Sequence, residues 1–368
     1  MPVTIFDSKM LFDKQSLFWD EKIIGGTPIS VHSVNTASID MTIGTGLGDK
    51  IIRQTKRRFN YRTGKSQIIN MTYNLGIPKL QVRKRVGLFD DNNGIFLEHD
   101  QNVVSFIVRS KASGSVVDTK INQSNWTGTI IDFSKVQLMI IDFAWLGIGR
   151  VRCGFMIEGQ IQYVCSFNFS NVISTVFMSN PNLPLRYEFE NLGISESSTI
   201  IQQICSSIAT EGGERNSNIR RVCDAASTGQ IGQTLTPILS IRLKSLQIGK
   251  TVSICDASIL NETNKNFYWG ISLNPIITGG ASASWNSVPE SAIEYDFSRN
   301  GSITDEGIKI ASGYVSDDIQ LVPFEPNSDI VLGSTIDGII DEVVLYAKLI
   351  SATGSNKFYT SLSWNELL

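Results

Sequence analysis

The chain has few side chains suited to nucleophilic or metal-assisted chemistry. Only two histidines occur, His32 and His99, and they are far apart in the sequence. A zinc site, a Ser-His-Asp triad or a Cys-His pair needs an imidazole beside other ligands or beside a nucleophile. The sequence therefore predicts none of these sites, and we expect no metal and no cofactor.

The cysteines do not form a recognisable redox or ligand motif. They are five in number, widely spaced and without a C-x-x-C pair: Cys153, Cys165, Cys205, Cys223 and Cys255. Buried, reduced thiols are the expected state. Cys153 and Cys165 fall on neighbouring predicted strands and could face each other, and packing is expected there rather than a disulfide.

Two loops have a superficial likeness to ligand-binding motifs. The run GTGLG at Gly44 to Gly48 is not closed by a lysine-serine pair, and no helical pattern follows it, so a turn between strands is predicted. The run DDNNG at Asp90 to Gly94 has calcium-ligand residue types but lacks the EF-hand spacing and its distal glutamate. A type I′ hairpin turn at Asn93-Gly94 is the preferred interpretation, and a calcium loop remains an alternative.

The clearest structural pattern lies between Ile130 and Phe169. Large apolar residues alternate with small or polar ones in three runs, 136–145, 150–157 and 160–167, which are separated by the turn formers LGIG and EG. Period-two alternation bounded by glycine turns is typical of antiparallel strands joined by tight connections. This segment is therefore predicted to be a β-meander.

The meander contains the sequence DFAWLGIGRVRCGF, which resembles the WLG-x-GRVR-x-GF signature of tailed-phage and other viral structural proteins. The matching positions are Asp142, Trp145, Gly147, Gly149, Arg150 and Arg152. Further blocks of the resemblance are GDKIIRQTKRRFNYRTGKSQ (48–67), SKVQ (134–137), QYVCSFNFSN (162–171), PNLPLRYEFEN (181–191) and SLSWNEL (361–367). The resemblance implies a concanavalin-like β-sandwich of the jelly-roll type, used as a component of a virion.

Glucanases share this sandwich fold, so the enzyme hypothesis is tested on residues. Retaining glucanases of the fold carry a strand EIDIEFLG, in which two glutamates and the aspartate between them point to one face. The run IIDFAWLG has Ile140 and Ala144 at the two glutamate positions and keeps only Asp142. Retaining hydrolysis needs two carboxyl groups roughly 5 Å apart. We therefore expect no enzyme, and we expect Asp142 to be a buried or rim carboxylate that hydrogen-bonds the adjacent turn.

The strand pattern predicts an all-β, antiparallel chain in three parts. Residues 1–55 are expected to form an N-terminal arm with short strands, and the first 20 of them to dock on a neighbouring subunit. Residues 56–260 are expected to form the concanavalin-like sandwich, with a loop insertion near 192–235. Residues 261–368 are expected to form a C-terminal β unit.

Charge is distributed unevenly along the sequence. Residues 50–85 contain 11 basic residues and no acidic one, whereas residues 290–342 contain twelve carboxylates. Such a division predicts contact between subunits or with an acidic capsid surface through Lys56, Arg57, Arg58 and Arg62. A solvated strand face is an equal alternative. Nucleic-acid contact, suggested by Phe59 and Tyr61 among the arginines, ranks lower because the net charge is −3.

Composition agrees with a β-rich structural protein. Charged residues make up 18% of the chain, below the roughly 25% of average domains. Neither a membrane span nor a secretory signal is recognisable, so assembly in a host cytoplasm into a virion is expected.

We therefore expect a non-enzymatic phage structural protein, either a head decoration or a neck or tail appendage. Its partners would be copies of itself and other virion proteins. The alternative is a glycan-binding receptor-recognition module of a tail fibre or spike, in which exposed Tyr268, Trp269 and Trp285 would stack on sugars.

Overall fold

The protein is described by a computed structural model that covers residues 2–128, 130–212, 218–262, 265–315, 320–323, 331–350 and 356–367. The chain divides into two compact units, Met1–Arg215 (unit 1) and Asn216–Leu368 (unit 2). Within the described ranges, the only helical elements are two short 3-10 turns, η1 (Gln123–Asn125) and η2 (Ser245–Gln247). All strand pairs are antiparallel, which confirms the predicted all-β class.

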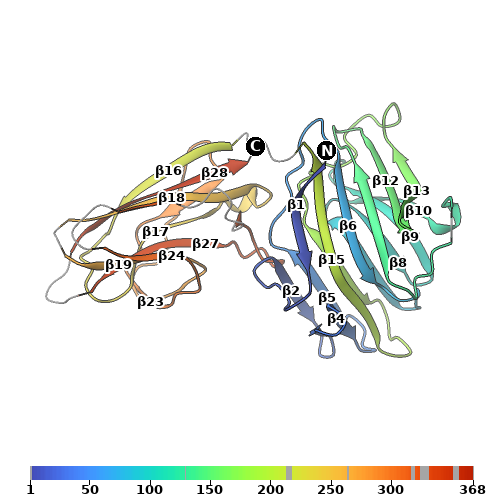
Figure 1. Ribbon diagram of the computed structural model, residues 1–368, viewed down its shortest axis with the longest axis horizontal. Coiled ribbons are helices and arrows are strands. Elements are labelled where there is room, and N and C mark those ends of the chain that lie inside the picture. The colour runs from blue at the N-terminus through green and yellow to red at the C-terminus, as the bar shows by residue number, and fades with distance from the viewer. Residues whose placement is uncertain are drawn as a thin grey trace. The chain divides into compact units, whose positions relative to one another are not determined.

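Unit 1 is a sandwich of two sheets (Figure 1). The eight-stranded sheet has the order β13-β12-β11-β6-β15-β4-β3, and β1 also pairs with β15. Its strands are β1 (Pro2–Lys9), β3 (Ile29–Ser33), β4 (Ser38–Ile43), β6 (Gln67–Asn74), β11 (Gln137–Phe143), β12 (Arg150–Ile157), β13 (Gln160–Asn168) and β15 (Thr199–Glu211). The seven-stranded sheet has the order β10-β9-β8-β7-β14-β5-β2. Its strands are β2 (Trp19–Ile24), β5 (Lys50–Thr55), β7 (Val82–Phe89), β8 (Gly94–Asp100), β9 (Val103–Ser110), β10 (Val117–Asn122) and β14 (Leu185–Asn191).

The core of unit 1 lies between these sheets and follows the alternation read from the sequence. Met139, Ile141 and Phe143 of β11 point into it, and Phe155 of β12 meets Phe106 of β9 with ring centroids 5.8 Å apart. The three predicted strands of the meander are β11, β12 and β13, in consecutive pairing. Cys153 and Cys165, which the sequence allowed to face each other, are direct partners across β12 and β13.

The N-terminal arm predicted to dock on a neighbour is instead part of unit 1's own sandwich. β1 pairs with β15, and the ring of Phe6 packs 4.9 Å from that of Phe59. Trp19 at the start of β2 is also buried. A bulge between Thr4 and Phe6 shifts the strand register, so the period-two pattern of a strand is interrupted in the sequence.

The loop insertion predicted near 192–235 is also wrong, because this stretch contains β15 and β16 (Asn218–Ala226). β15 lies inside the sheet between β6 and the pair β1 and β4, and polar side chains occupy part of its inward face. Gln203 accepts a hydrogen bond from Arg53 Nε at 2.7 Å, and Ser206 Oγ lies 3.1 Å from the Tyr187 hydroxyl. These buried polar pairs make a central strand look like a loop in the sequence.

Unit 2 is a second sandwich, and it begins near residue 216 rather than at 261. One sheet has the order β16-β28-β18-β25, with β26 also on β18, and the other has the order β21-β22-β17-β27-β19-β24. Beside β16, their strands are β17 (Thr236–Leu243), β18 (Thr251–Asn261), β19 (Phe267–Leu273), β21 (Asn286–Ser287), β22 (Ile293–Asp296), β24 (Ile308–Val315), β25 (Gln320–Pro323), β26 (Val331–Leu332), β27 (Glu342–Leu349) and β28 (Phe358–Leu367). A small sheet pairs β20 (Ile276–Thr278) with β23 (Ser302–Asp305).

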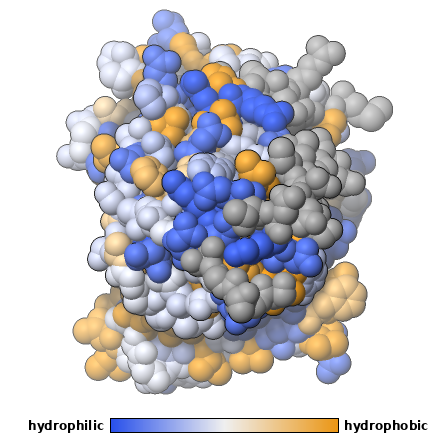
Figure 2. Space-filling view, turned by 90° about the vertical axis from the view of Figure 1, so that its left-hand side faces the viewer, coloured by the Kyte–Doolittle hydropathy of each residue, from blue (hydrophilic) through white to orange (hydrophobic). Residues whose placement is uncertain are grey.

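The boundary differs from the prediction because β17 and β18 pack in the core of unit 2. Ile241 and Ile259 join Trp269 and Trp364 in one buried cluster. The face of the molecule in Figure 2 mixes hydrophilic and hydrophobic side chains over its coloured upper part, where hydrophobic ones stand singly or in small groups. No helix in the described ranges is long and apolar enough to cross a membrane.

Candidate functional site

The signature segment forms a tight connection between β11 and β12. Leu146 and Gly147 adopt the left-handed conformation, with φ of 35° and 78°. The amide of Gly149 donates to the carbonyl of Trp145 at 2.8 Å, and a Cβ on Gly149 would lie 1.6 Å from the backbone oxygen of Ala144. Glycine is therefore required at position 149 for steric reasons.

The same segment forms hydrogen bonds that link the β11–β12 hairpin to Phe177 and Met178. The indole Nε1 of Trp145 donates to the carbonyl of Met178 at 3.0 Å, and the amide of Phe177 donates to the carbonyl of Gly147 at 2.8 Å. Trp145 also packs edge-on to the buried Tyr61, with ring centroids 6.0 Å apart. These positions of the signature thus hold backbone in place.

Asp142 lies on the face of β11 that points away from the core, because Ile141 and Phe143 point into it. Its carboxylate forms an ion pair with Arg152, its direct partner on β12, and accepts a hydrogen bond from the Tyr163 hydroxyl at 3.2 Å. The guanidinium of Arg152 also lies 4.3 Å from the ring centroid of Tyr163. Burial and the Asp142 carboxylate raise the pKa of Tyr163. Asp142 is thus a hydrogen-bonded carboxylate, but its partners lie on β12 and β13 and not in the adjacent turn that the sequence predicted.

No second carboxylate accompanies Asp142 at the positions that a retaining glucanase would use. Ile140 occupies one of them and is completely buried, and Ala144 occupies the other. No group of three or more His, Cys, Asp or Glu side chains that could hold a metal ion occurs in the described parts of the chain. A shallow groove of about 350 Å³ lies beside the ion pair, where Arg150, Arg152, Tyr163 and Ser166 are among its lining residues.

The loop DDNNG connects β7 to β8, as predicted, but not through a two-residue turn at Asn93-Gly94: residues 90–93 form the connection, and Gly94 is the first residue of β8, opposite Phe89. The carboxylates of this loop face arginines. Asp90 Oδ1 accepts hydrogen bonds from the amides of Asn92 and Asn93, and Asp90 Oδ2 accepts one from Arg58 at 2.7 Å. Asp91 pairs with Arg186 at 2.9 Å. A calcium ion would have to displace both guanidinium groups, so this arrangement favours a structural turn.

At least five of the eleven basic residues of the stretch 50–85 form ion pairs with carboxylates of unit 1. Lys56, Arg57, Arg58 and Arg62 are all half-buried, and the carboxylate partner of Arg58 is Asp90 of the same unit. Unit 1 contains 22 Lys and Arg against 19 Asp and Glu, a net of +3, and unit 2 contains 10 against 16, a net of −6. The charge division of the sequence is therefore much weaker in the folded units.

A network of charged side chains explains this neutralisation. Sheet pairing places β14 between β5 and β7, so the carboxylates of β14 meet the basic residues of both strands. Glu188 at its centre accepts hydrogen bonds from Arg85 at 3.1 Å and from Arg186 at 2.6 Å. We call the set the charge network; its members are Lys50, Arg83, Arg85, Glu98, Arg186, Glu188 and Glu190.

Burial alone would raise the pKa of Glu188, but the positive charges of Arg186, Lys50 and Arg85 outweigh this effect and lower the pKa to about 2.

Phe59 and Tyr61, the two aromatic residues that suggested stacking on nucleic-acid bases, are both buried. They cannot stack on a nucleic acid in this position.

The aromatic residues expected to stack on sugars do not form a platform. Trp269 is 2% exposed and belongs to the core of unit 2, and Tyr268 is 8% exposed beneath neighbouring side chains. Trp285 is half-buried, and guanidinium groups lie over its ring, Arg242 at 4.0 Å and Arg299 at 5.5 Å from the centroid. The alternation of β19 buries Trp269, whereas the guanidinium nearest Trp285 belongs to Arg242 of β17, 43 residues earlier in the sequence.

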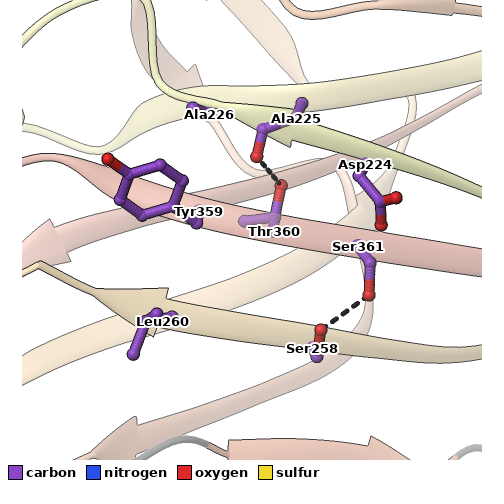
Figure 3. Close-up of a pocket in the computed structure, with 8 residues that line it drawn as sticks. All are labelled: Asp224, Ala225, Ala226, Ser258, Leu260, Tyr359, Thr360 and Ser361. Carbon is purple, nitrogen blue, oxygen red and sulfur yellow. Dashed lines mark hydrogen bonds between the residues drawn. The ribbon is translucent and has the colours of Figure 1, made fainter.

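The sequence did not indicate a wider groove on unit 2. It has a volume of about 570 Å³ and lies on the sheet of β16, β28 and β18, lined by residues that include Asp224, Ser258, Tyr359 and Ser361 (Figure 3). Its floor consists of serines from strands about 100 residues apart, and no local motif marks such a floor.

No protein-family model matches the sequence, and no curated protein is significantly similar to it. Among solved structures, the chain is similar to an endo-β-1,4-glucuronan lyase from the fungus Trichoderma reesei, with 8% identity, a TM-score of 0.39 and coverage of 56% of this chain and 95% of that one. A β-glucanase of Bacillus licheniformis has 8% identity, a TM-score of 0.34 and coverage of 55% and 96%. A legume lectin-like domain from Entamoeba histolytica has 10% identity, a TM-score of 0.33 and coverage of 56% and 97%. Likeness at this level concerns the fold alone and gives no activity or ligand.

Proposed function

We propose that the protein is a non-enzymatic structural protein of a virus, an accessory subunit of a tailed-phage virion that acts through protein-protein contacts. Its place is the head surface or a neck or tail appendage. The proposal rests on the WLG-x-GRVR-x-GF resemblance and on what the matching residues do in unit 1. Trp145, Gly147 and Gly149 fix a turn, and Arg152 and Asp142 fix two strands.

The proposal that the protein is not an enzyme rests on one observation, the hydrogen-bonding partners of the Asp142 carboxylate. Its carboxylate is engaged by Arg152 and Tyr163. The neighbouring outward positions are a buried isoleucine and an alanine, so no acid/base partner stands across from it. A retaining mechanism has no second carboxyl group here. The alternative of a receptor-recognition module stacking on Tyr268 and Trp269 loses its support, because both residues are buried.

The contact surface of the subunit would be the open edge of the unit 1 sandwich. β2 ends one sheet and β3 ends the other, and only four residues join these two edge strands. Edge strands with exposed apolar side chains are sites for pairing with another chain. We call this set the edge surface; its members are Leu11, Phe12, Leu17, Phe18, Ile23, Ile24, Ile29 and Val31, each at least 40% exposed.

The edge surface replaces the basic stretch as the proposed assembly contact. Arg58 and the charge network find carboxylates within unit 1, whereas Phe12 is 88% exposed and Ile29 is 54% exposed. A second copy of the chain or another virion protein would cover these side chains. Their burial would supply the hydrophobic driving force of assembly.

Mass spectrometry of purified, protease-washed particles tests the proposal. The chain should be present in a fixed ratio to the major capsid protein, and antibodies against it should label one part of the particle. A chain found only in lysates of infected cells, and not in particles, would overturn the virion assignment. Loss of particle-bound chain on substitution in the edge surface would identify the contact.

A further inference from the structure

A groove on unit 2 has the features of a binding site that none of the proposed contacts uses. It lies on the outer face of the sheet that contains β16, β28 and β18 (Figure 3). Cys223, Leu362 and Ile259 point into the core of unit 2, so the residues next to them on each strand point outward. Asp224 and Ser258 are thereby placed on the open face.

The groove arises where a row of short polar side chains lies beside a row that contains two large side chains. Strand register aligns Asp224, Ser361 and Ser258 across the three strands. The next row along aligns Ala226, Tyr359 and Leu260. The two serine hydroxyls lie 2.6 Å apart and form the floor, as Figure 3 shows. The volume of about 570 Å³ falls within the range of small-ligand sites.

The rim of the groove offers an apolar surface on one side. Tyr359 is 39% exposed and Leu260 is 40% exposed. The hydroxyl of Tyr359 donates to Glu262 Oε1 at 3.4 Å in an exposed contact. The ring is an amphipathic surface, and the Lys357 ammonium lies 5.4 Å from its centroid.

The other side of the groove is polar. Asp224 is exposed, and its carboxylate forms no hydrogen bond or ion pair with any part of the chain that the structure describes. A carboxylate can accept from several hydroxyls, and a serine hydroxyl can both donate and accept. Apolar and polar surfaces therefore face the same cavity from opposite sides.

We propose that this groove binds a neutral oligosaccharide through one pyranose ring. The apolar face of the ring would lie on Tyr359, and the hydroxyl edge would reach Asp224, Ser258 and Ser361. An extended peptide that adds a strand would pair with the free edge of β16 and would not occupy the sheet face that forms the groove. An acidic sugar would meet the Asp224 carboxylate and be repelled.

The experiment titrates the purified full-length chain with cellotriose, maltotriose and chitotriose, and follows binding by saturation-transfer NMR. At least one of the three is expected to bind. Asp224→Asn and Tyr359→Ala should each weaken that binding about tenfold or more, a loss of about 1.4 kcal/mol. Tyr359→Phe, which keeps the ring, should retain it. The matched control is Tyr314→Ala, which removes a 74% exposed aromatic of unit 2 that does not line the groove.

Absence of binding by all three sugars at about 10 mM, a concentration that detects dissociation constants in the millimolar range, would overturn the proposal. Binding that neither Asp224→Asn nor Tyr359→Ala weakens would also overturn it. Asp224→Asn changes an exposed side chain at constant size, so its result is independent of any folding defect in Tyr359→Ala. The test uses no particles, so its failure leaves the virion proposal standing.

Discussion

Arg152 and Asp142 face each other directly across β12 and β11, and the guanidinium donates a hydrogen bond to the Asp142 carboxylate. The pair joins two residues of the signature that are ten positions apart in the sequence. It also leaves the only carboxylate on the outward face of β11 already engaged. The pair therefore links β11 to β12 through side chains as well as through the backbone.

We predict that the purified protein releases no reducing sugar from β-glucans. Retaining hydrolysis needs two carboxyl groups, and the two positions where a retaining glucanase has glutamates are Ile140 and Ala144 in this chain. A reducing-sugar assay on mixed-linkage and β-1,3 glucans measures this. If the protein releases reducing sugar and Asp142→Ala abolishes this activity, a second catalytic carboxyl group exists elsewhere in the chain. The non-enzymatic proposal would then be wrong.

Replacing Trp145 by alanine should lower the free energy of unfolding by about 3 kcal/mol. The side chain is half-buried against the core and its indole N–H bonds to the Met178 carbonyl. Trp145→Phe keeps most of the packing and should cost only about 1 kcal/mol for the lost hydrogen bond. Denaturant unfolding of both variants provides the values, and equal losses would mean that the ring contributes no packing.

Gly149→Ala should destabilise unit 1 by more than about 2 kcal/mol, in the range of overpacked positions. The new Cβ would lie 1.6 Å from the backbone oxygen of Ala144, so the turn would have to open. Gly26→Ala is the matched control, because its Cβ would meet no atom within 4 Å. If both variants unfold at the same denaturant concentration, the turn between β11 and β12 has room for a side chain at position 149 and the steric explanation is incorrect.

Acid should unfold unit 1 partly through Glu188. The folded pKa, lowered to about 2 by the surrounding cations, lies below the ordinary value of 4.5. The charge network therefore stabilises the fold fully above about pH 4.5, and this contribution is lost as the pH falls toward 2. Glu188→Gln should be less stable than the wild type at pH 7, because three cations lose their counter-charge, and its stability should change less between pH 4.5 and 2. A parallel pH dependence in the two proteins would exclude Glu188 from this role.

The sequence predicted the meander, the signature hairpin and the all-β class because β11, β12 and β13 alternate regularly and are local in sequence. It did not predict the extent of unit 1. β1 contains a register shift at Thr4 to Phe6, and β15 carries the buried polar residues Gln203 and Ser206, so neither shows a clean strand pattern. The boundary at 215 could not be read without these two strands.

The candidate sites were predictable only where they are local. Asp142 and Arg152 lie in one hairpin, and their surroundings follow from its register. Glu188 and Arg85 are 103 residues apart in the sequence. The basic stretch alone therefore does not indicate that its carboxylate partners lie on the neighbouring strand of the sheet. The serine groove joins Ser258 and Ser361 across the same distance. Contacts of this kind depend on sheet order, which the alternation pattern leaves open.

Charging the edge surface should abolish assembly without changing the fold. A lysine at Ile29 or Val31 places a charge on an exposed edge strand, where it opposes strand pairing. Val172→Lys is the control, at a 73% exposed site outside the edge surface. Incorporation into particles, measured beside thermal unfolding of the free chain, should fall for Ile29→Lys and stay normal for Val172→Lys. Normal incorporation of all variants would exclude the edge surface as the assembly contact.

Cryo-electron microscopy of the intact virion would reveal the position and the contacts of this chain together. We predict density for it at a fixed site on the head, neck or tail, with β2 and β3 of unit 1 against another copy or another virion protein. The basic residues Arg58 and Arg85 should face their own unit's carboxylates. Particles without this chain, or an isolated copy whose edge surface faces only water, would contradict the proposed role in the virion.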